Sequence, residues 1–397
     1  MQTNKIFFTL CTIILSLTLS GCDWLHKRAT RETVFDRIVN IPKEFVLDIP
    51  QLPPLCDVLP GIKKGFADIK NGKLYYEEEG HGIPLVLIHG GPGSTHHMFH
   101  PGFSRYKEFA HMIYYDQRGT GKATSRDDTG KMYSLRQAIE DLESLRKHLK
   151  LDQWFVLGQS YGGFLAQCYA LTYPERVKGL ILCSSLDGLK KVDAMKNNRQ
   201  QDFISQEEQE AIKKVWAAKD AGKLTLEQAY YNASLAGDWK RNSYEKPVDE
   251  DLIRTALYVW CPAPGFRELI CSEYFNEFCG LDGKFDDFEI PTLIVEGKWD
   301  SNWGTDKVEF MRKNHPHAQV EIFENSGHGI SSTEEDKFLN ILKKFLEKAD
   351  KAKIDYKPGN RLPWPKPKSD SEIKKIMTQR SEEHTSELPS PNTQSYA

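Results

Sequence analysis

The sequence predicts an α/β protein in which helices cover both faces of a mostly parallel sheet and a helical domain is inserted into the chain. Short apolar runs alternate with helix-like stretches over residues 62–187 and again over 289–350. Continuous apolar strands separated by helices are typical of a parallel sheet buried on both faces. Between these two parts, residues 188–288 are rich in Gln, Glu, Lys, Tyr and Trp and largely helical in character, which indicates a cap.

The first element expected is a hairpin, because Asn71-Gly72 accepts the positive φ angles of a tight turn. Its strands are Phe66–Ile69 and Lys73–Glu78. Further strands are expected at Pro84–His89, Met112–Tyr115, Trp154–Leu157, Val177–Cys183, Ile290–Val295 and Val320–Phe323. Helices are expected at Ser134–Lys150, Phe164–Tyr173 and Glu334–Lys348.

The composition is that of a folded and nearly neutral protein. The chain has 397 residues, of which 53 are basic and 56 acidic, giving a formal net charge of −3, and 39% are hydrophobic. Because basic residues are not in excess, nothing favours binding to the phosphates of a nucleic acid. The length allows two domains or one domain with an insertion, and leaves the oligomeric state open.

A lipoprotein signal is predicted over residues 1–21. Lys5 precedes the apolar run Ile6–Leu19, which is too short for an ordinary transmembrane helix. The run ends in LSGC at Cys22, which resembles the lipobox of bacterial lipoproteins. This resemblance implies a lipid on Cys22 that anchors the protein to a membrane of the bacterial cell envelope. A plain secretory signal or an uncleaved N-terminal helix is the alternative.

Three further segments lie outside the two predicted domains. Residues 22–61 mix charges with several prolines, which predicts a tether and an N-terminal extension that lies on the domain. Residues 351–379 form a basic, Pro-containing tail that we expect to be solvated, with contact to an anionic surface as the alternative. Residues 380–397 open with RSEEHTSEL, which resembles one reading frame of a sequencing-library adapter, so this last tail is expected to be non-native, with a native polar tail as the alternative.

A serine nucleophile is predicted at Ser160. The motif GQSYGG, residues 158–163, lies between an apolar strand and a helix, the context of a nucleophile elbow. In such an elbow, small neighbouring residues permit a strained turn that exposes the serine hydroxyl above the sheet. An ordinary Gly-rich turn is the alternative.

Asp300 and His328 are the predicted acid and base. Asp300 lies in GKWD after the strand ending at Val295, and His328 lies in SGHG after the strand ending at Phe323. Both therefore follow Ser160 in the order Ser, Asp, His and fall at the same edge of a parallel sheet. A histidine that is held in orientation by a carboxylate can remove the proton of a serine hydroxyl.

The loop HGGPG, residues 89–93, follows an apolar strand, and its glycines leave backbone N–H groups free to approach a ligand. This loop can supply one donor to an oxyanion, and the N–H of Tyr161, directly after the nucleophile, can supply the other.

Together, HGGPG, then DQRGTGKAT at Asp116–Thr124, then GQSYGG resemble the proline iminopeptidase (prolyl aminopeptidase) family over roughly Gly65 to Ala349. The resemblance implies the α/β-hydrolase fold with a helical cap, and release of an N-terminal residue from a peptide or amide through an acyl-enzyme on Ser160. It also implies that Gly91 and Tyr161 donate to the oxyanion and that residues 116–119 form a structural loop. One departure is Ala123, where many relatives have Ser.

The cap is expected to bind the substrate's free amine. An α-amino group has a pKa of about 7.7–8.0, so selecting its charged form requires a carboxylate near the nucleophile. Glu245, Glu268 and Glu273 lie beside aromatic residues of the cap and are the candidates, with Glu273 the first choice. Each of them is otherwise a solvated surface charge.

Other functions on the same fold remain open. A carboxylesterase, amidase or lactonase would use the same three catalytic residues, whereas an epoxide hydrolase or haloalkane dehalogenase needs a carboxylate where Ser160 stands. A catalytically silent binding protein would be expected to have lost one of the three. The sequence contains no HExxH motif and no Cys/His cluster with ligand spacing, so no metal and no other cofactor is predicted.

If Cys22 is lipidated, the protein should partition with membranes in a bacterial host, because the acyl chains add a hydrophobic anchor. We expect Cys22→Ala to release or misprocess the protein, as measured by membrane fractionation and mass spectrometry of the mature N-terminus. A wild-type mature form that is soluble and carries no lipid would contradict the lipoprotein prediction.

Overall fold

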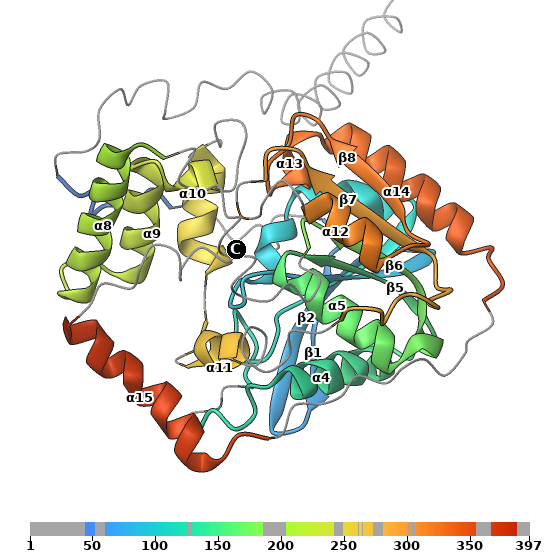
Figure 1. Cartoon of the computed structure of the whole chain (residues 1–397), viewed down its shortest axis with the longest axis horizontal. Helices are drawn as coiled ribbons and strands as arrows, with labels where there is room; N and C mark the ends of the chain where they lie inside the picture. The colour runs from blue at the N-terminus through green and yellow to red at the C-terminus, as the bar shows by residue number, and fades with distance from the viewer. Residues whose placement is uncertain are drawn as a thin grey trace, which may run out of the picture.

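The computed structural model describes residues 44–51, 60–125, 127, 129–185, 204–241, 249–260, 262–263, 265–272, 281–300, 302, 307–354 and 367–386. Within them, one sheet has the strand order β1-β2-β4-β3-β5-β6-β7-β8 (Figure 1). The strands are β1 (Lys63–Ile69), β2 (Gly72–Gly80), β3 (Ile83–Ile88), β4 (Ala110–Tyr115), β5 (Trp154–Gln159), β6 (Val177–Cys183), β7 (Thr292–Gly297) and β8 (Gln319–Phe323). Strands β3 to β8 are parallel and the hairpin β1–β2 is antiparallel, which confirms the predicted α/β-hydrolase fold class.

Alternate residues of each central strand enter two separate cores. In β3, Val86 and Ile88 pack on one face of the sheet, and Leu85 and Leu87 pack on the other. Because side chains alternate along a strand, a continuous apolar run fills both cores. The first face is covered by α4 (Leu135–His148) and α5 (Tyr161–Thr172), and the second by η2 (Gly102–Glu108), α13 (Ile330–Thr333) and α14 (Glu335–Ala349). Short helices η1 (His96–Phe99), η3 (Pro174–Arg176) and α12 (Lys307–Asn314) complete the sheet domain.

The chain between β6 and β7 forms helices that lie to one side of the sheet in Figure 1. They are α8 (Gln206–Asp220), α9 (Leu226–Leu235), η4 (Asp238–Arg241), α10 (Asp249–Arg254), the π-helix η5 (Thr255–Val259) and α11 (Phe266–Ser272). Both α8 and α9 begin with a capping box, led by Ser205 and Thr225, which satisfies backbone N–H groups of the first turn. Ile212 and Val215 of α8 pack in a cluster with Ala229 of α9, so this part of the chain has a small core of its own.

The N-terminal extension lies on this cap. The backbone N–H of Val46 donates to the side-chain amide of Asn232 at 2.7 Å, and that amide donates back to the Val46 carbonyl at 2.8 Å. Gln228 donates to the Leu47 carbonyl at 2.7 Å, and Ile49 is buried in a cluster with residues of α9 and α10. Residues 44–51 therefore hold the outer face of α9.

The basic tail is not simply solvated. Helix α15 (Asp370–Ser386) packs against α11, and its Ile373 is buried in the core of the first sheet face. A Cβ added to Gly265 would lie 2.0 Å from the sulfur of Met377, which shows how closely the two segments approach. The expectation of a solvated tail is wrong for this helix, and the helix also continues across the expected boundary at residue 380.

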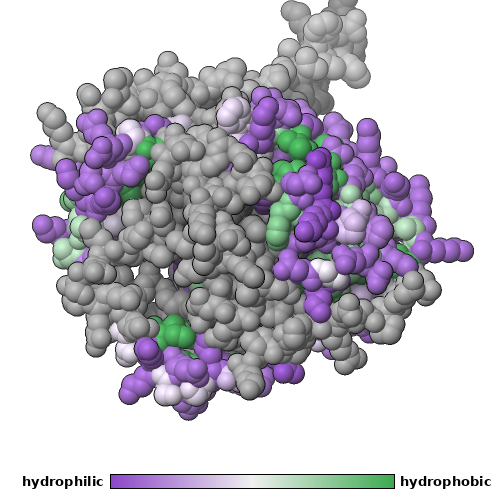
Figure 2. Space-filling model, viewed as in Figure 1, coloured by the Kyte–Doolittle hydropathy of each residue, from purple (hydrophilic) through white to green (hydrophobic). Residues whose placement is uncertain are grey.

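The part of the chain that the structure describes contains no helix both long and apolar enough to span a membrane. On the face shown in Figure 2, the described surface is mostly hydrophilic with small hydrophobic patches. The predicted signal, residues 1–21, and Cys22 lie outside the described residues.

Candidate active site

Ser160 occupies a strained turn between β5 and α5. Its φ and ψ are 56° and −126°, and a positive φ is costly for a residue with a Cβ. The turn is possible because two neighbours lack side chains. A Cβ on Gly162 would lie 2.1 Å from the Ile88 carbonyl oxygen, and one on Gly158 would lie 2.2 Å from the Gly162 carbonyl oxygen. The geometry is that expected of a nucleophile elbow.

Asp300 and His328 meet in the loops after β7 and β8. His328 Nδ1 lies 2.8 Å from Asp300 Oδ2, and both side chains are buried. The other oxygen, Asp300 Oδ1, accepts the N–H of Asn302 at 3.0 Å. Burial alone would raise the pKa of Asp300, but the charges of His328 and Lys307 outweigh it and lower the pKa. A charged Asp300 fixes the proton of His328 on Nδ1.

Strand β6 connects this pair to the serine. The N–H of Ser160 donates to the Cys183 carbonyl at 2.9 Å, and the next residue, Ser184, donates from its hydroxyl to the His328 carbonyl at 2.9 Å. All three predicted catalytic residues therefore stand at the C-terminal edge of neighbouring parallel strands, where loops of open α/β sheets form their sites.

A buried ion pair behind Asp300 was not foreseen from the sequence. Lys307 Nζ lies 2.6 Å from Glu296 Oε2 and 3.8 Å from Asp300 Oδ2, and all three side chains are at most 4% exposed. Burial raises the pKa of Glu296 to about 7, and Lys307 offsets this only in part. The signal in the sequence was a charged residue that continues the apolar strand β7.

The glycine loop after β3 packs against the serine. A Cβ on Gly90 would lie 3.0 Å from the Cβ of Ser160, so the two segments are in close contact there. The N–H of Gly90 is directed at the sulfur of Met98, 3.4 Å away, and Gly91 remains the candidate donor that the resemblance implied. Tyr161 begins α5, where backbone N–H groups are not used by the helix.

The neighbouring loop supports the glycine loop, as the resemblance implied. Gln117 donates its backbone N–H to His89 Nε2 at 3.1 Å and its side chain to the His89 carbonyl at 2.8 Å. Burial lowers the pKa of His89 to about 4, so the imidazole is neutral and can accept this bond. Arg118 holds Asp141 through two hydrogen bonds of 2.7 and 2.9 Å.

The cap reaches this site through the segment before α11. A Cβ on Gly93 would lie 3.0 Å from Pro262 and 3.1 Å from the side chain of Arg267. The N–H of Ala263 donates to the Gly119 carbonyl at 2.6 Å. One cap segment thus touches both loops that surround the serine.

The candidate amine-binding acids are not placed by the structure. Glu245 and Glu273 lie outside the described residues, and of Glu268 only the backbone, in α11, is described.

Sequence comparison agrees with this geometry. The alpha/beta hydrolase fold family matches residues 83–335 of the chain. The proline iminopeptidase of Clostridium botulinum is 33% identical over 299 residues, which cover 73% of this chain and 99% of that protein. The proline iminopeptidase of Lactobacillus acidophilus is 31% identical over 278 residues, 67% of this chain and 91% of that protein.

Two solved structures share the fold. A thermophilic esterase from Thermogutta terrifontis has a TM-score of 0.56 and 18% identity, with 72% of this chain and 99% of that chain covered. The proline iminopeptidase of Mycobacterium smegmatis has a TM-score of 0.55 and 16% identity, with 72% and 99% covered. Similarity at this level of identity concerns the fold alone.

Lys307→Met should destabilise the protein by about 3 kcal/mol at pH 8, because it leaves the Glu296 carboxyl buried without its cation. The pKa of Glu296 in the folded chain is above its unfolded value, so its stabilising contribution is present at low pH and is lost as pH rises. Urea unfolding should therefore show that Lys307→Met lowers the free energy of unfolding less at pH 5 than at pH 8.

The double variant Glu296→Gln with Lys307→Met is the control, since it removes both charges together. We expect it to recover most of the stability that Lys307→Met loses at pH 8. A double variant no more stable than Lys307→Met would show that the ion pair is not the cause.

Proposed function

Since the chain belongs to the proline iminopeptidase family of alpha/beta hydrolases, we propose that it is a serine aminopeptidase releasing an N-terminal proline or small apolar residue from short peptides or amides. The observation that carries this proposal is the strained Ser160 at the sheet edge that also holds the Asp300–His328 pair. A carboxylate-bound imidazole at the same sheet edge as a serine is the arrangement that acyl transfer requires.

The first half of the proposed reaction forms an acyl-enzyme. Ser160 Oγ attacks the carbonyl carbon of the N-terminal residue while His328 Nε2 takes the hydroxyl proton. The carbonyl oxygen becomes an oxyanion, for which the N–H groups of Gly91 and Tyr161 are the proposed donors. His328 then protonates the leaving amine as the C–N bond breaks, which leaves an ester on Ser160.

The second half hydrolyses this ester. His328 removes a proton from water, the hydroxide adds to the ester carbonyl, and collapse returns the proton to Ser160 Oγ. The released amino acid carries the original carbonyl as a carboxylic acid. Asp300 keeps the Nδ1 proton of His328 in place throughout and stabilises the imidazolium that forms twice per cycle.

We also propose that a cap carboxylate binds the substrate's ammonium, with Glu245, Glu268 and Glu273 the candidates and Glu273 the first choice. An anchored amine would place the first peptide bond at Ser160 and exclude chains blocked at the N-terminus.

The cellular location is part of the same proposal. A lipid on Cys22 would hold the enzyme at a membrane of the bacterial cell envelope, where short peptides are its substrates.

Ser160→Ala and His328→Ala should each lower kcat/KM for an aminoacyl-naphthylamide by on the order of 10⁴-fold or more, and Asp300→Asn by a similar factor, because the three groups act as a unit. Circular dichroism should show that folding is intact. Ser144→Ala, on the outer helix α4, is the matched serine control and should retain full activity. Activity of Asp300→Asn near that of the wild type would assign the acid role to another residue.

Acetylating the substrate's N-terminus should reduce kcat/KM by orders of magnitude, since it removes the positive charge that the proposed carboxylate selects. The measurement compares free and acetylated prolyl-naphthylamide, together with short fatty-acid esters. Replacing the glutamate that binds the ammonium with glutamine should lower kcat/KM for the free prolyl-naphthylamide. The difference in kcat/KM between the free and the acetylated substrate should therefore become smaller. Equal hydrolysis of blocked and free substrates would instead identify an amidase or esterase.

A further inference from the structure

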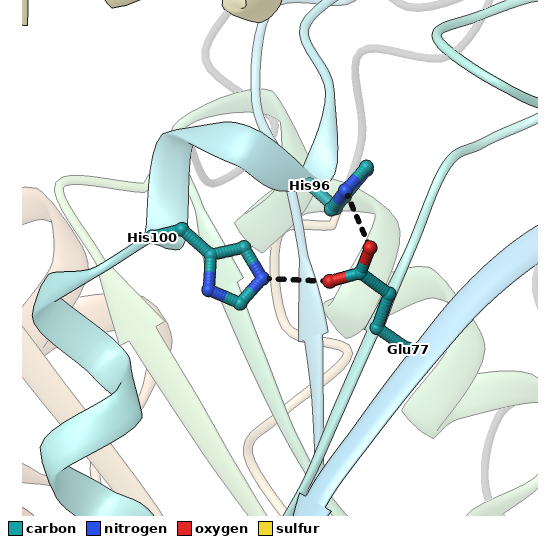
Figure 3. A group of neighbouring side chains, drawn as sticks. All are labelled: Glu77, His96 and His100. Carbon is teal, nitrogen blue, oxygen red and sulfur yellow. Dashed lines mark ion pairs between the residues drawn. The ribbon is translucent and has the colours of Figure 1, made fainter. Parts of the chain in front are cut away.

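A second polar cluster is buried beside η1, away from the catalytic pair. Glu77 projects from β2, His96 begins η1 and His100 follows its last residue (Figure 3). Their side chains have no exposed surface. No step of the proposed reaction uses these three residues.

The three side chains converge on one point. Glu77 Oε1 lies 3.3 Å from His96 Nε2, and Glu77 Oε2 lies 3.1 Å from His100 Nε2. Dashed lines mark both contacts in Figure 3. Potential ligand atoms of the three residues all lie within 4.8 Å of one another. Ligands bound to zinc at about 2.0–2.1 Å in a tetrahedron are separated by about 3.3 Å, so the shorter contacts already match.

The surroundings fix the tautomer of His96. Its Nδ1 lies 2.8 Å from Asp116 Oδ1, and a carboxylate can only accept, so Nδ1 carries the proton. Asp116 is held in turn by the backbone N–H groups of His96, at 2.9 Å, and Lys122, at 2.7 Å. In the neutral ring, Nε2 then presents its lone pair towards Glu77. A histidine whose other nitrogen donates to a carboxylate is the usual outer arrangement of a metal-bound imidazole.

A positive charge between Glu77 and the two histidines would stabilise all three side chains. A lone pair of His96 facing a carboxylate oxygen at 3.3 Å is repulsive unless a proton or a metal ion lies between them. His100 Nε2 and Glu77 Oε2 lie 3.1 Å apart in a contact that is not aligned as a hydrogen bond. An ion is one explanation for buried polar atoms in this state, and imidazole nitrogens with a carboxylate are ligands that a transition metal uses.

We propose that Glu77, His96 and His100 bind a divalent transition-metal ion of the zinc class. Two imidazoles and a carboxylate suit zinc and its neighbours, whereas calcium and magnesium prefer oxygen ligands alone. Each oxygen of Glu77 faces one histidine, so a bidentate carboxylate with two imidazoles supplies four ligand atoms. The ion would tie β2 to η1, and so stabilise the fold without taking part in hydrolysis.

The test uses the full protein, stripped of metal with a chelator in dilute urea and refolded with or without Zn²⁺. We expect one equivalent of tightly bound zinc by mass spectrometry of the elements, a higher Tm, and visible absorption bands when Co²⁺ replaces zinc. His100→Gln and Glu77→Gln should each weaken zinc binding by at least about 100-fold, and Asp116→Asn by about 10-fold or more.

His111→Gln is the matched control. Its Nε2 lies 2.7 Å from Glu78 Oε2 in a partly exposed pair, and neither residue belongs to the cluster, so zinc binding should be unchanged. If Glu77→Gln fails to fold, the zinc affinity of His100→Gln and the Co²⁺ spectrum of the wild type still test whether the cluster binds a metal. Absence of saturable zinc binding in the wild type, or equal binding by wild type and His100→Gln, would overturn the proposal and leave a proton as the bridging charge.

Discussion

A Cβ at Gly162 would lie 2.1 Å from the Ile88 carbonyl oxygen, so the first turn of α5 rests on the end of β3 with no side chain between them. This contact decides the geometry of the catalytic edge. It forces the chain to turn sharply at Ser160, and β3 also leads into the glycine loop that packs on the serine. The nucleophile and the loop are therefore positioned by one backbone contact, and the strain at Ser160 is sustained by packing over the whole sheet.

Charged side chains around Asp300 also stabilise the candidate site. Asp300 has His328 on one side and Lys307 on the other, so its charge is supported in an environment that would otherwise protonate it. Lys307 is shared with Glu296, whose pKa is raised to about 7. The ammonium of Lys307 thus interacts with two carboxyl groups. When Glu296 is protonated, the positive charge of Lys307 is balanced less by Glu296 and stabilises the charge of Asp300 more. His328 is thus linked through Asp300 to the buried pair Lys307 and Glu296.

The sequence predicted the sheet well because apolar runs report burial directly. The run at the seventh strand was expected to end at Val295, yet β7 continues through Glu296, whose partner Lys307 comes from a different element. A contact between residues of two different elements leaves no periodic pattern in the local sequence from which it could be predicted. The candidate catalytic residues could be predicted for the opposite reason, since each follows a strand in a short motif and parallel strands end at a common edge.

Two other features were missed for related physical reasons. His96 and His100 were not among the predicted site residues, because their meeting with Glu77 requires the hairpin β1–β2 to pair with β4. In the tail, Ile373 and Met377 are four residues apart on one face of α15, but the surrounding lysines gave the segment the composition of a solvated tail. The average polarity of this segment therefore did not reveal the two apolar residues on one face of the helix.

The hydrogen bonds between Val46 and Asn232 fasten the N-terminal segment to α9 of the cap. A chain attached to a surface at its N-terminus would pass any pulling force first to α9, in the cap, and not to the sheet that carries the serine. Shortening the protein to begin at the first strand would remove that link and leave the outer face of α9 bare.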